Sequence, residues 1–302
     1  MTTRYWYIPL LMGVALLAAA CAGPRAGTFA TPEEAVQALV ESTENAARAE
    51  ELLGPGGFDV LKSGDDVADR EDIVAVKGLI LQRVAFKDSG EGRKIALLGH
   101  DAWELPIPLV SEGERWRFDV EAGKEEVLNR RVGRNELLTI ATLHAGVDAQ
   151  REYARQGRDG NAPAYARKWF SDPGKQDGLY WPVPEGELES PLGLLVAAAA
   201  AEGYQRSDER PVPYHGYFYR ILTAQGANAP GGAKGYVDAA GLMTGGFALL
   251  AWPATYGNSG IMTFQVNHLG IVFQRDLGPD TEQEAQRITA FDPDASWEPT
   301  GD

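Results

Sequence analysis

The order of apolar and polar positions predicts helices and then strands in the first part of the chain. Thr31-Pro32-Glu33-Glu34 fits a capping box with proline at the first helical position, so we expect a helix from there to about Leu53. The acidic run 65–72 is expected to be exposed, and a second helix or a mixed segment is expected over residues 71–85. Three strand-like runs follow, at residues 94–98, 103–110 and 115–120, the last two joined by a hairpin turn.

A long helix and an antiparallel sheet are predicted for the second half. Apolar residues from Leu137 to Val147 recur at steps of three and four, which predicts a helix over residues 135–156. A further helix is expected to begin after Ser190 and to end at Glu202. Four strands are expected beyond it, at residues 216–224, 246–252, 262–266 and 271–274. Residues 246–252 are apolar on both faces, which is typical of a central strand.

This order of elements indicates an α+β protein with two domains. We expect an N-terminal α+β domain over residues 31–122, a charged junction over 123–134 and a C-terminal α+β domain over 135–302. The N-terminal pattern of helix and hairpin sheet is similar to the cone-shaped nuclear-transport-factor-like fold.

The N-terminal segment resembles a bacterial lipoprotein signal. An apolar run of residues 5–20 ends at Cys21, the only cysteine in the chain. The run has the length of a signal-peptide core and is short for a membrane span of about 20 residues. We interpret residues 1–20 as the signal peptide, Cys21 as the site of lipid attachment and residues 21–30 as a tether; an ordinary signal peptide or an uncleaved anchor are the alternatives. Because Ala22 follows the cysteine, we expect an outer-membrane lipoprotein that faces the periplasm.

Composition narrows the range of partners. Of the 302 residues, 44% are hydrophobic and 24% are charged, which is normal for a globular protein, and the net charge is −15. Nucleic acids and anionic lipid surfaces require a basic face, so the charge argues against both. The expected partners are a membrane, reached through the lipid anchor, and an envelope protein or glycan.

One loop combines acids and aromatic residues. Asp172 and Asp177 lie on a turn-rich segment beside Tyr180 and Trp181. Carboxylates next to an aromatic platform suit a sugar or peptide site, or a calcium site. The alternative is a loop whose acids only cap turns.

Other candidate residues are more scattered. His215 lies in the densest aromatic block, and Tyr256 precedes a Gly-Asn-Ser-Gly turn. If Asp172, Asp177, His215 and Tyr256 surrounded one deep cleft, an enzyme would be favoured. Arg130, Arg131 and Arg134 are expected to pair with Glu125, Glu126 and Glu136, with an anion site as the alternative. No catalytic motif and no zinc-site spacing is present in the sequence, so no cofactor is expected unless the loop binds calcium.

The amino-acid sequences of several segments resemble the bacterial family called domain of unknown function 2950. The segments that carry this likeness are residues 116–119 with 131–136, 172–181, 213–218 with 221–226 and 229–232, 246–253 with 256–260, and 276–281. The resemblance spans nearly the whole mature chain and implies an exported protein, but it implies no activity. Residues 135–275 are also similar to the globular heads of type IV pilins, with a Tyr153-Ala154 pair on a long helix before a small sheet. In pilins an apolar helix precedes this position, whereas residues 123–134 are charged.

These observations lead to two functional hypotheses. The first is a non-enzymatic binding or assembly module in the cell envelope. The alternative is a hydrolase or carbohydrate-active enzyme that uses the loop from Asp172 to Trp181.

Overall fold

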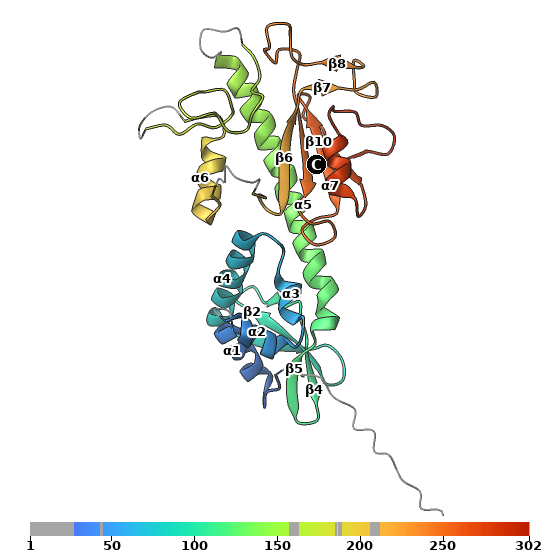
Figure 1. Cartoon of the computed structure of the whole chain (residues 1–302). Helices are drawn as coiled ribbons and strands as arrows, with labels where there is room; N and C mark the ends of the chain where they lie inside the picture. The colour runs from blue at the N-terminus through green and yellow to red at the C-terminus, as the bar shows by residue number, and fades with distance from the viewer. Residues whose placement is uncertain are drawn as a thin grey trace, which may run out of the picture.

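The computed structural model describes residues 27–42, 45–156, 163–184, 186, 189–205 and 212–301. Cys21 and the signal segment lie outside these ranges. The described residues form an α+β structure with two lobes that are joined by one long helix, α5 (Val120–Gln156), drawn in green in Figure 1. The N-terminal lobe is built from the elements before α5, and the C-terminal lobe from the elements after it.

In the N-terminal lobe, four helices cover a small antiparallel sheet. The helices are α1 (Pro32–Ser42), α2 (Ala46–Leu53), α3 (Gly57–Leu61) and α4 (Asp66–Gln82). The strands are β1 (Val84–Asp88), β2 (Arg93–Leu98), β3 (Trp103–Glu104), β4 (Leu109–Glu112) and β5 (Arg115–Phe118), in the order β1-β2-β4-β5 with β3 also paired to β2. Their core includes Val36, Leu98, Leu109 and Phe118, all of which are buried.

The expected helix from residue 32 to 53 is two helices. The side chain of Asn45 accepts hydrogen bonds from the backbone amides of Ala47 and Arg48, which makes it the N-cap of a new helix, α2. The expected hairpin of β4 and β5 is confirmed, with Ser111 paired to Trp116.

The second half matches the expected order of a long helix and an antiparallel sheet. The C-terminal lobe contains α6 (Gly193–Glu202), α7 (Thr281–Arg287) and a sheet in the order β12-β11-β10-β9-β6. The strands of this sheet are β6 (Tyr217–Leu222), β9 (Ala248–Pro253), β10 (Met262–Asn267), β11 (Val272–Asp276) and β12 (Glu298–Pro299). The short strands β7 (Ala224–Gln225) and β8 (Lys234–Gly235) form a separate pair. β9 is central and almost wholly buried, as its apolar pattern predicts.

The long helix begins earlier than expected, at Val120 instead of residue 135. The helix runs through Gly123 without interruption. A side chain at this position would collide with Ile107, so the glycine permits close packing against the loop before β4. The charged residues of the junction lie on this helix: Glu126 and Arg130 form an ion pair one turn apart. Residues 123–134 are therefore helix. Whether the lobes fold independently stays a prediction.

Separate hydrophobic clusters occupy the two lobes. The larger one lies between α5 and the C-terminal sheet and includes Leu143, Val147 and Leu249. α5 packs on β9 and β10, and α7 packs on β9. Although α5 is long, it is strongly charged, and in the described ranges no helix combines the length and the apolar character that a membrane crossing requires.

Candidate functional site

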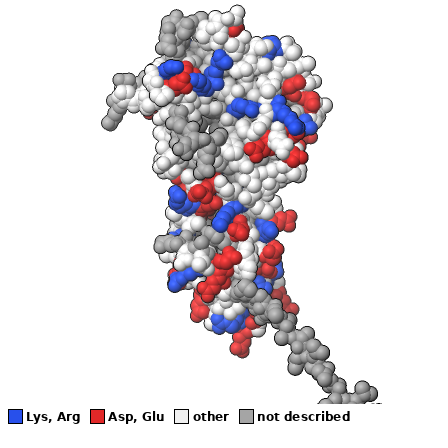
Figure 2. Space-filling view, viewed as in Figure 1, with Lys and Arg blue, Asp and Glu red and all other residues white. Residues whose placement is uncertain are grey.

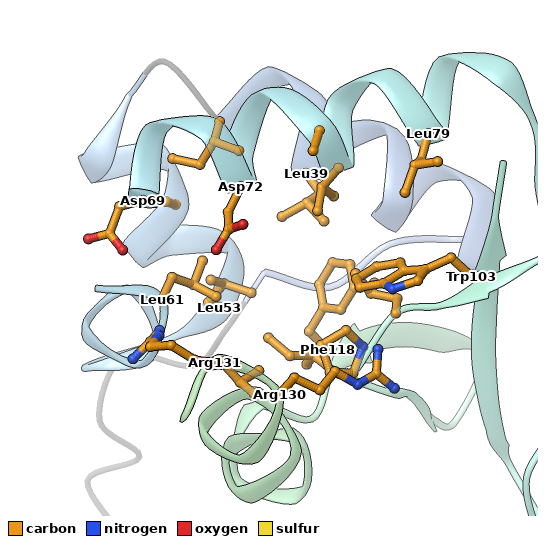
Figure 3. Close-up of a pocket in the computed structure, with 18 of the residues that line it drawn as sticks. Leu39, Leu53, Leu61, Asp69, Asp72, Leu79, Trp103, Phe118, Arg130 and Arg131 are labelled. Carbon is orange, nitrogen blue, oxygen red and sulfur yellow. The ribbon is translucent and has the colours of Figure 1, made fainter. Parts of the chain in front are cut away.

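An apolar pocket of about 430 Å³ opens in the N-terminal lobe between α4, α5 and the first sheet. Its apolar lining comes from the helices α1 to α5, from β3 and β5, and from the segment between β3 and β4. The lining residues are Leu39, Ala49, Leu53, Leu61, Ile73, Ala75, Val76, Leu79, Trp103, Leu105, Pro106, Ile107, Phe118 and Val127. Figure 3 shows Leu39, Leu53 and Leu61 around the space, with Phe118 and Trp103 on the opposite side. A cavity of this size and lining falls within the range of small-molecule binding sites.

Charged side chains from two helices border the pocket. Asp69 and Asp72 come from α4, and Arg130, Arg131 and Arg134 come from α5. Arg134 lies four residues after Arg130 and three after Arg131, so it neighbours both on the helix surface. On the face shown in Figure 2, charged residues are dense over the N-terminal lobe and the junction, whereas large areas of the C-terminal lobe are uncharged.

Arg131 is a buried charge, with a residue exposure of only 6%. Its guanidinium donates to the carbonyls of Val60, at 2.7 Å, and Lys62, at 3.1 Å, and to the side-chain oxygen of Asn258 in the C-terminal lobe. In the part of the chain that the structure describes, no carboxylate lies within ion-pair distance of it. Burial therefore lowers the pKa of Arg131, and the more distant Asp69 offsets this in part.

The other two arginines have carboxylate partners. Arg130 Nε donates to Glu126 at 2.6 Å, which confirms that predicted pair. Arg134 binds both carboxylate oxygens of Asp72 instead of a glutamate of its own helix, so the prediction for it was wrong. Glu136 accepts hydrogen bonds from the amides of Ile261 and Met262, each at 3.0 Å, and so joins α5 to β10.

Asp65 was expected to be exposed, and the structure shows it to be 4% exposed. One carboxylate oxygen accepts hydrogen bonds from the amides of Val67 and Ala68 and so caps α4. The other accepts from the Tyr204 hydroxyl at 2.8 Å and from the Gly216 amide at 3.0 Å, both in the C-terminal lobe. The carboxylate therefore connects the two lobes, which is why it is buried at their junction.

His215 lies beside this contact. Its backbone has a φ of 48°, and its ring packs against Tyr214 at a centroid distance of 4.0 Å, with the two ring planes tilted by 45°. Nε2 lies 3.5 Å from the Glu202 carboxylate. Burial lowers the pKa of His215, while burial together with the nearby acids Glu71 and Asp65 raises the pKa of Glu202. We infer a neutral imidazole in a half-buried aromatic setting at neutral pH.

The acids of the predicted loop have lysine partners. Lys168 Nζ lies 2.7 Å from Asp172 and 2.8 Å from Asp177, and Lys175 also contacts Asp172. The Asp172 amide donates to Asp177 at 2.9 Å. The bonds to Lys168 lower the pKa of Asp172, so the carboxylate is charged and neutralised by a lysine. These contacts describe an ion-paired turn.

The aromatic residues of that loop serve packing. Trp181 is 8% exposed and meets Tyr153 edge to face at 6.4 Å, within a small cluster under the loop. Tyr180 meets Phe170 in the same way at 5.8 Å. Tyr256 lies elsewhere, where its hydroxyl donates to Asp276 at 3.2 Å.

Among the described residues, neither of two hollows holds these candidates together. A second hollow of about 540 Å³ lies beside α7 and has a polar lining that includes Arg275, Glu284 and Trp297. Asp172, Asp177, His215 and Tyr256 line neither this hollow nor the apolar pocket. Within the described ranges, no three His, Cys, Asp or Glu side chains are grouped so as to hold a metal ion.

Sequence reasoning missed the apolar pocket. Its lining residues are spread from Leu39 to Arg134, and each looks like an ordinary core residue in its own segment. The feature of the sequence that could have indicated this site is the group of arginines at residues 130–134. For these arginines we expected ion pairs with glutamates and considered an anion site only as the alternative.

Comparison with known proteins gives a family and no activity. No curated protein and no solved structure matches the chain, so the likenesses to nuclear-transport-factor-like and pilin folds remain predictions. One family model, described as a protein of unknown function (DUF2950), matches residues 26–300. Because this match covers nearly the whole sequence, the chain belongs to the DUF2950 family.

Proposed function

We propose that this protein is a non-enzymatic binding module of the cell envelope, with the apolar pocket of the N-terminal lobe as its ligand site. The observation that supports this most directly is the pocket's lining, in which apolar side chains from helices and sheet border an open space of about 430 Å³. Natural cores are close-packed, so a cavity of this size within a small lobe leaves apolar surface without contacts. A ligand with an apolar part would restore those contacts.

The charged groups at the pocket favour binding over catalysis. Asp69 accepts the single Ser63 amide hydrogen with both of its carboxylate oxygens, and Asp72 is bound by Arg134. A general base must be within reach of a substrate proton and free to accept it. Both acids are already committed to structural partners, so the rim suits a role in holding a ligand.

The proposed location depends on the N-terminal segment. Cys21 and the apolar residues before it support a lipid anchor, and three acyl chains would hold the protein firmly at a membrane. The pocket would then take up its ligand in the periplasm, on the outer membrane.

The pocket can be tested by closing its entrance. Ala75 lines the pocket and is exposed on α4, so Ala75→Trp should fill the entrance without disturbing the core. Val74→Trp is the matched control, because Val74 is the next residue, is 64% exposed and does not line the pocket. We expect the parent and Val74→Trp to bind the neutral fluorescent probe N-phenyl-1-naphthylamine, and Ala75→Trp to bind it at least about tenfold more weakly, which corresponds to 1.4 kcal/mol.

Thermal melts of both variants would establish that they are folded. The proposal fails if the folded parent binds no probe, or if Ala75→Trp binds it as well as Val74→Trp does.

A further inference from the structure

Arg130 is the arginine at the pocket whose position is fixed but whose charge partner can be exchanged. Its guanidinium lies 5.3 Å from the centre of the Trp103 ring, and Nη1 donates to the Glu104 carbonyl at 2.6 Å. Both contacts hold the group beside the pocket wall, and Figure 3 shows it under Trp103. A guanidinium that is held in place presents its remaining donors in a fixed plane, which suits a carboxylate or a phosphate.

The carboxylate partner of Arg130 is weakly held. Glu126 lies one turn earlier on α5, and the two side chains are 49% and 35% exposed. Ion pairs of this kind between exposed residues contribute little, because water and salt screen them. An anion that arrives together with buried apolar contacts can therefore displace Glu126 from Arg130.

The remaining charges near the pocket do not offer the same opportunity. Arg131 is buried among backbone carbonyls, and Arg134 is bound by both oxygens of Asp72. The Glu104 side chain is held by Lys87. Asp69 accepts the Ser63 amide and lies near the Arg131 guanidinium, and Asp72 is bound by Arg134, so both aspartates at the rim already have a cationic neighbour.

We propose that the pocket binds a single-chain anionic amphiphile, with its apolar chain among Val76, Leu79 and Phe118 and its head group on Arg130 in place of Glu126. This inference rests on the proposed function and adds the class of ligand. The net charge of −15 repels anions at long range, but at physiological ionic strength that repulsion is screened over about 8 Å. The contact with Arg130 lies within this screening distance, so it decides the preference for an anionic head group over a neutral or cationic one.

Three probes with the same ten-carbon chain and different head groups test the inference. Calorimetric titration with decanoate, decanol and decylamine, below their micelle concentrations, should show decanoate binding at least tenfold more tightly than decanol, and decylamine binding most weakly. Decyl phosphate in place of decanoate tells whether a carboxylate or a phosphate fits better, and a preference for either over decanol supports the inference.

Variants of Arg130 and of its partner Glu126 show whether this ion pair determines the head-group preference. Arg130→Gln should reduce the ratio of decanoate to decanol affinity to about one, and Arg130→Lys should keep part of the preference. Glu126→Gln should strengthen decanoate binding several-fold, because it removes the competing carboxylate. Arg117→Gln is the matched control: Arg117 forms a similar exposed pair with Glu112 in the same lobe and does not line the pocket, so the ratio should not change.

Two kinds of failure can be told apart. If decanol binds the parent as well as decanoate does, or if folded Arg130→Gln keeps the full preference, the anionic head group is wrong while the pocket still binds. If none of the three probes binds the folded parent, the proposed function itself is wrong.

Discussion

Buried charged side chains join the two lobes of this molecule. Asp65 accepts hydrogen bonds from both lobes, and Arg131 donates to the carbonyls that precede α4 and to Asn258. A buried charge is tolerated only when its hydrogen-bonding groups are satisfied, and here backbone groups satisfy most of them. These two residues therefore fix the geometry of the junction at the level of single atoms.

His215 should make stability depend on pH. Burial lowers its pKa below the ordinary value of about 6.5, so the folded protein binds this proton less readily than the unfolded chain does. Its contribution is present above that value and is lost as the pH falls through it toward the folded pKa. We expect the free energy of unfolding, measured with urea, to decrease between pH 7 and pH 5.

The variant His215→Asn should have a smaller decrease over the same interval. Asparagine tolerates the left-handed backbone at this position, so the substitution tests the ring and not the turn. His268, whose pKa burial also lowers, remains in the variant and accounts for part of the slope that is left. An unchanged pH dependence would show that His215 does not titrate in this way.

At the scale of elements, two of the glycines of α5, Gly123 and Gly133, should respond in opposite directions to the same change. A Cβ at Gly123 would lie 2.7 Å from Ile107 Cα and 2.9 Å from the Pro106 carbonyl, whereas a Cβ at Gly133 meets nothing within 4 Å. Alanine in a helix is favoured over glycine by about 0.5–1 kcal/mol. We expect Gly133→Ala to stabilise the protein by about that amount and Gly123→Ala to destabilise it.

Urea unfolding of both variants measures the difference. Because each variant makes the same substitution in the same helix, Gly133→Ala controls for helix propensity. Stabilisation by both would mean that α5 does not pack closely against the loop before β4.

The strands were predictable from sequence where their local pattern was complete. β9 is apolar on both faces and was expected to be a central strand, and it lies between β10 and β6. β10 and β11 were expected as strands at residues 262–266 and 271–274, and they pair with each other. The long helix was only partly predicted. Its repeat from Leu137 onward is regular, but the charged stretch from Gly123 looks like a linker until its packing against Ile107 is known.

The candidate site was less predictable than the fold. Asp65 caps α4 and accepts from Gly216, far away in sequence, so nothing local distinguishes it from a solvated acid in an acidic run. The apolar pocket forms where α4, α5 and the sheet meet, and a single sequence does not show how closely these elements pack. The aromatic character of Trp181 was recognised, but its burial depends on Tyr153 in α5.

At the scale of the whole molecule, Cys21 should decide where the protein resides. Cys21→Ser removes the thiol that would be acylated, so we expect the variant to leave the membrane fraction or to accumulate as an unprocessed precursor. Ala22→Ser is a neighbouring control that keeps the thiol. Cell fractionation followed by mass spectrometry of the N-terminus measures both results, and a Cys21→Ser protein that is processed and fractionates like the parent would exclude the lipid anchor.

The continuity of α5 sets a reach for the anchored protein. At 1.5 Å per residue, a helix of 37 residues is about 55 Å long. Five residues separate Cys21 from Gly27, and these six Cα-to-Cα steps can extend at most about 20 Å, so an acylated Cys21 would keep the N-terminal lobe and its pocket close to the lipid. The same helix would then separate the C-terminal sheet from the membrane by up to its own length. The sheet could contact molecules that lie away from the bilayer surface.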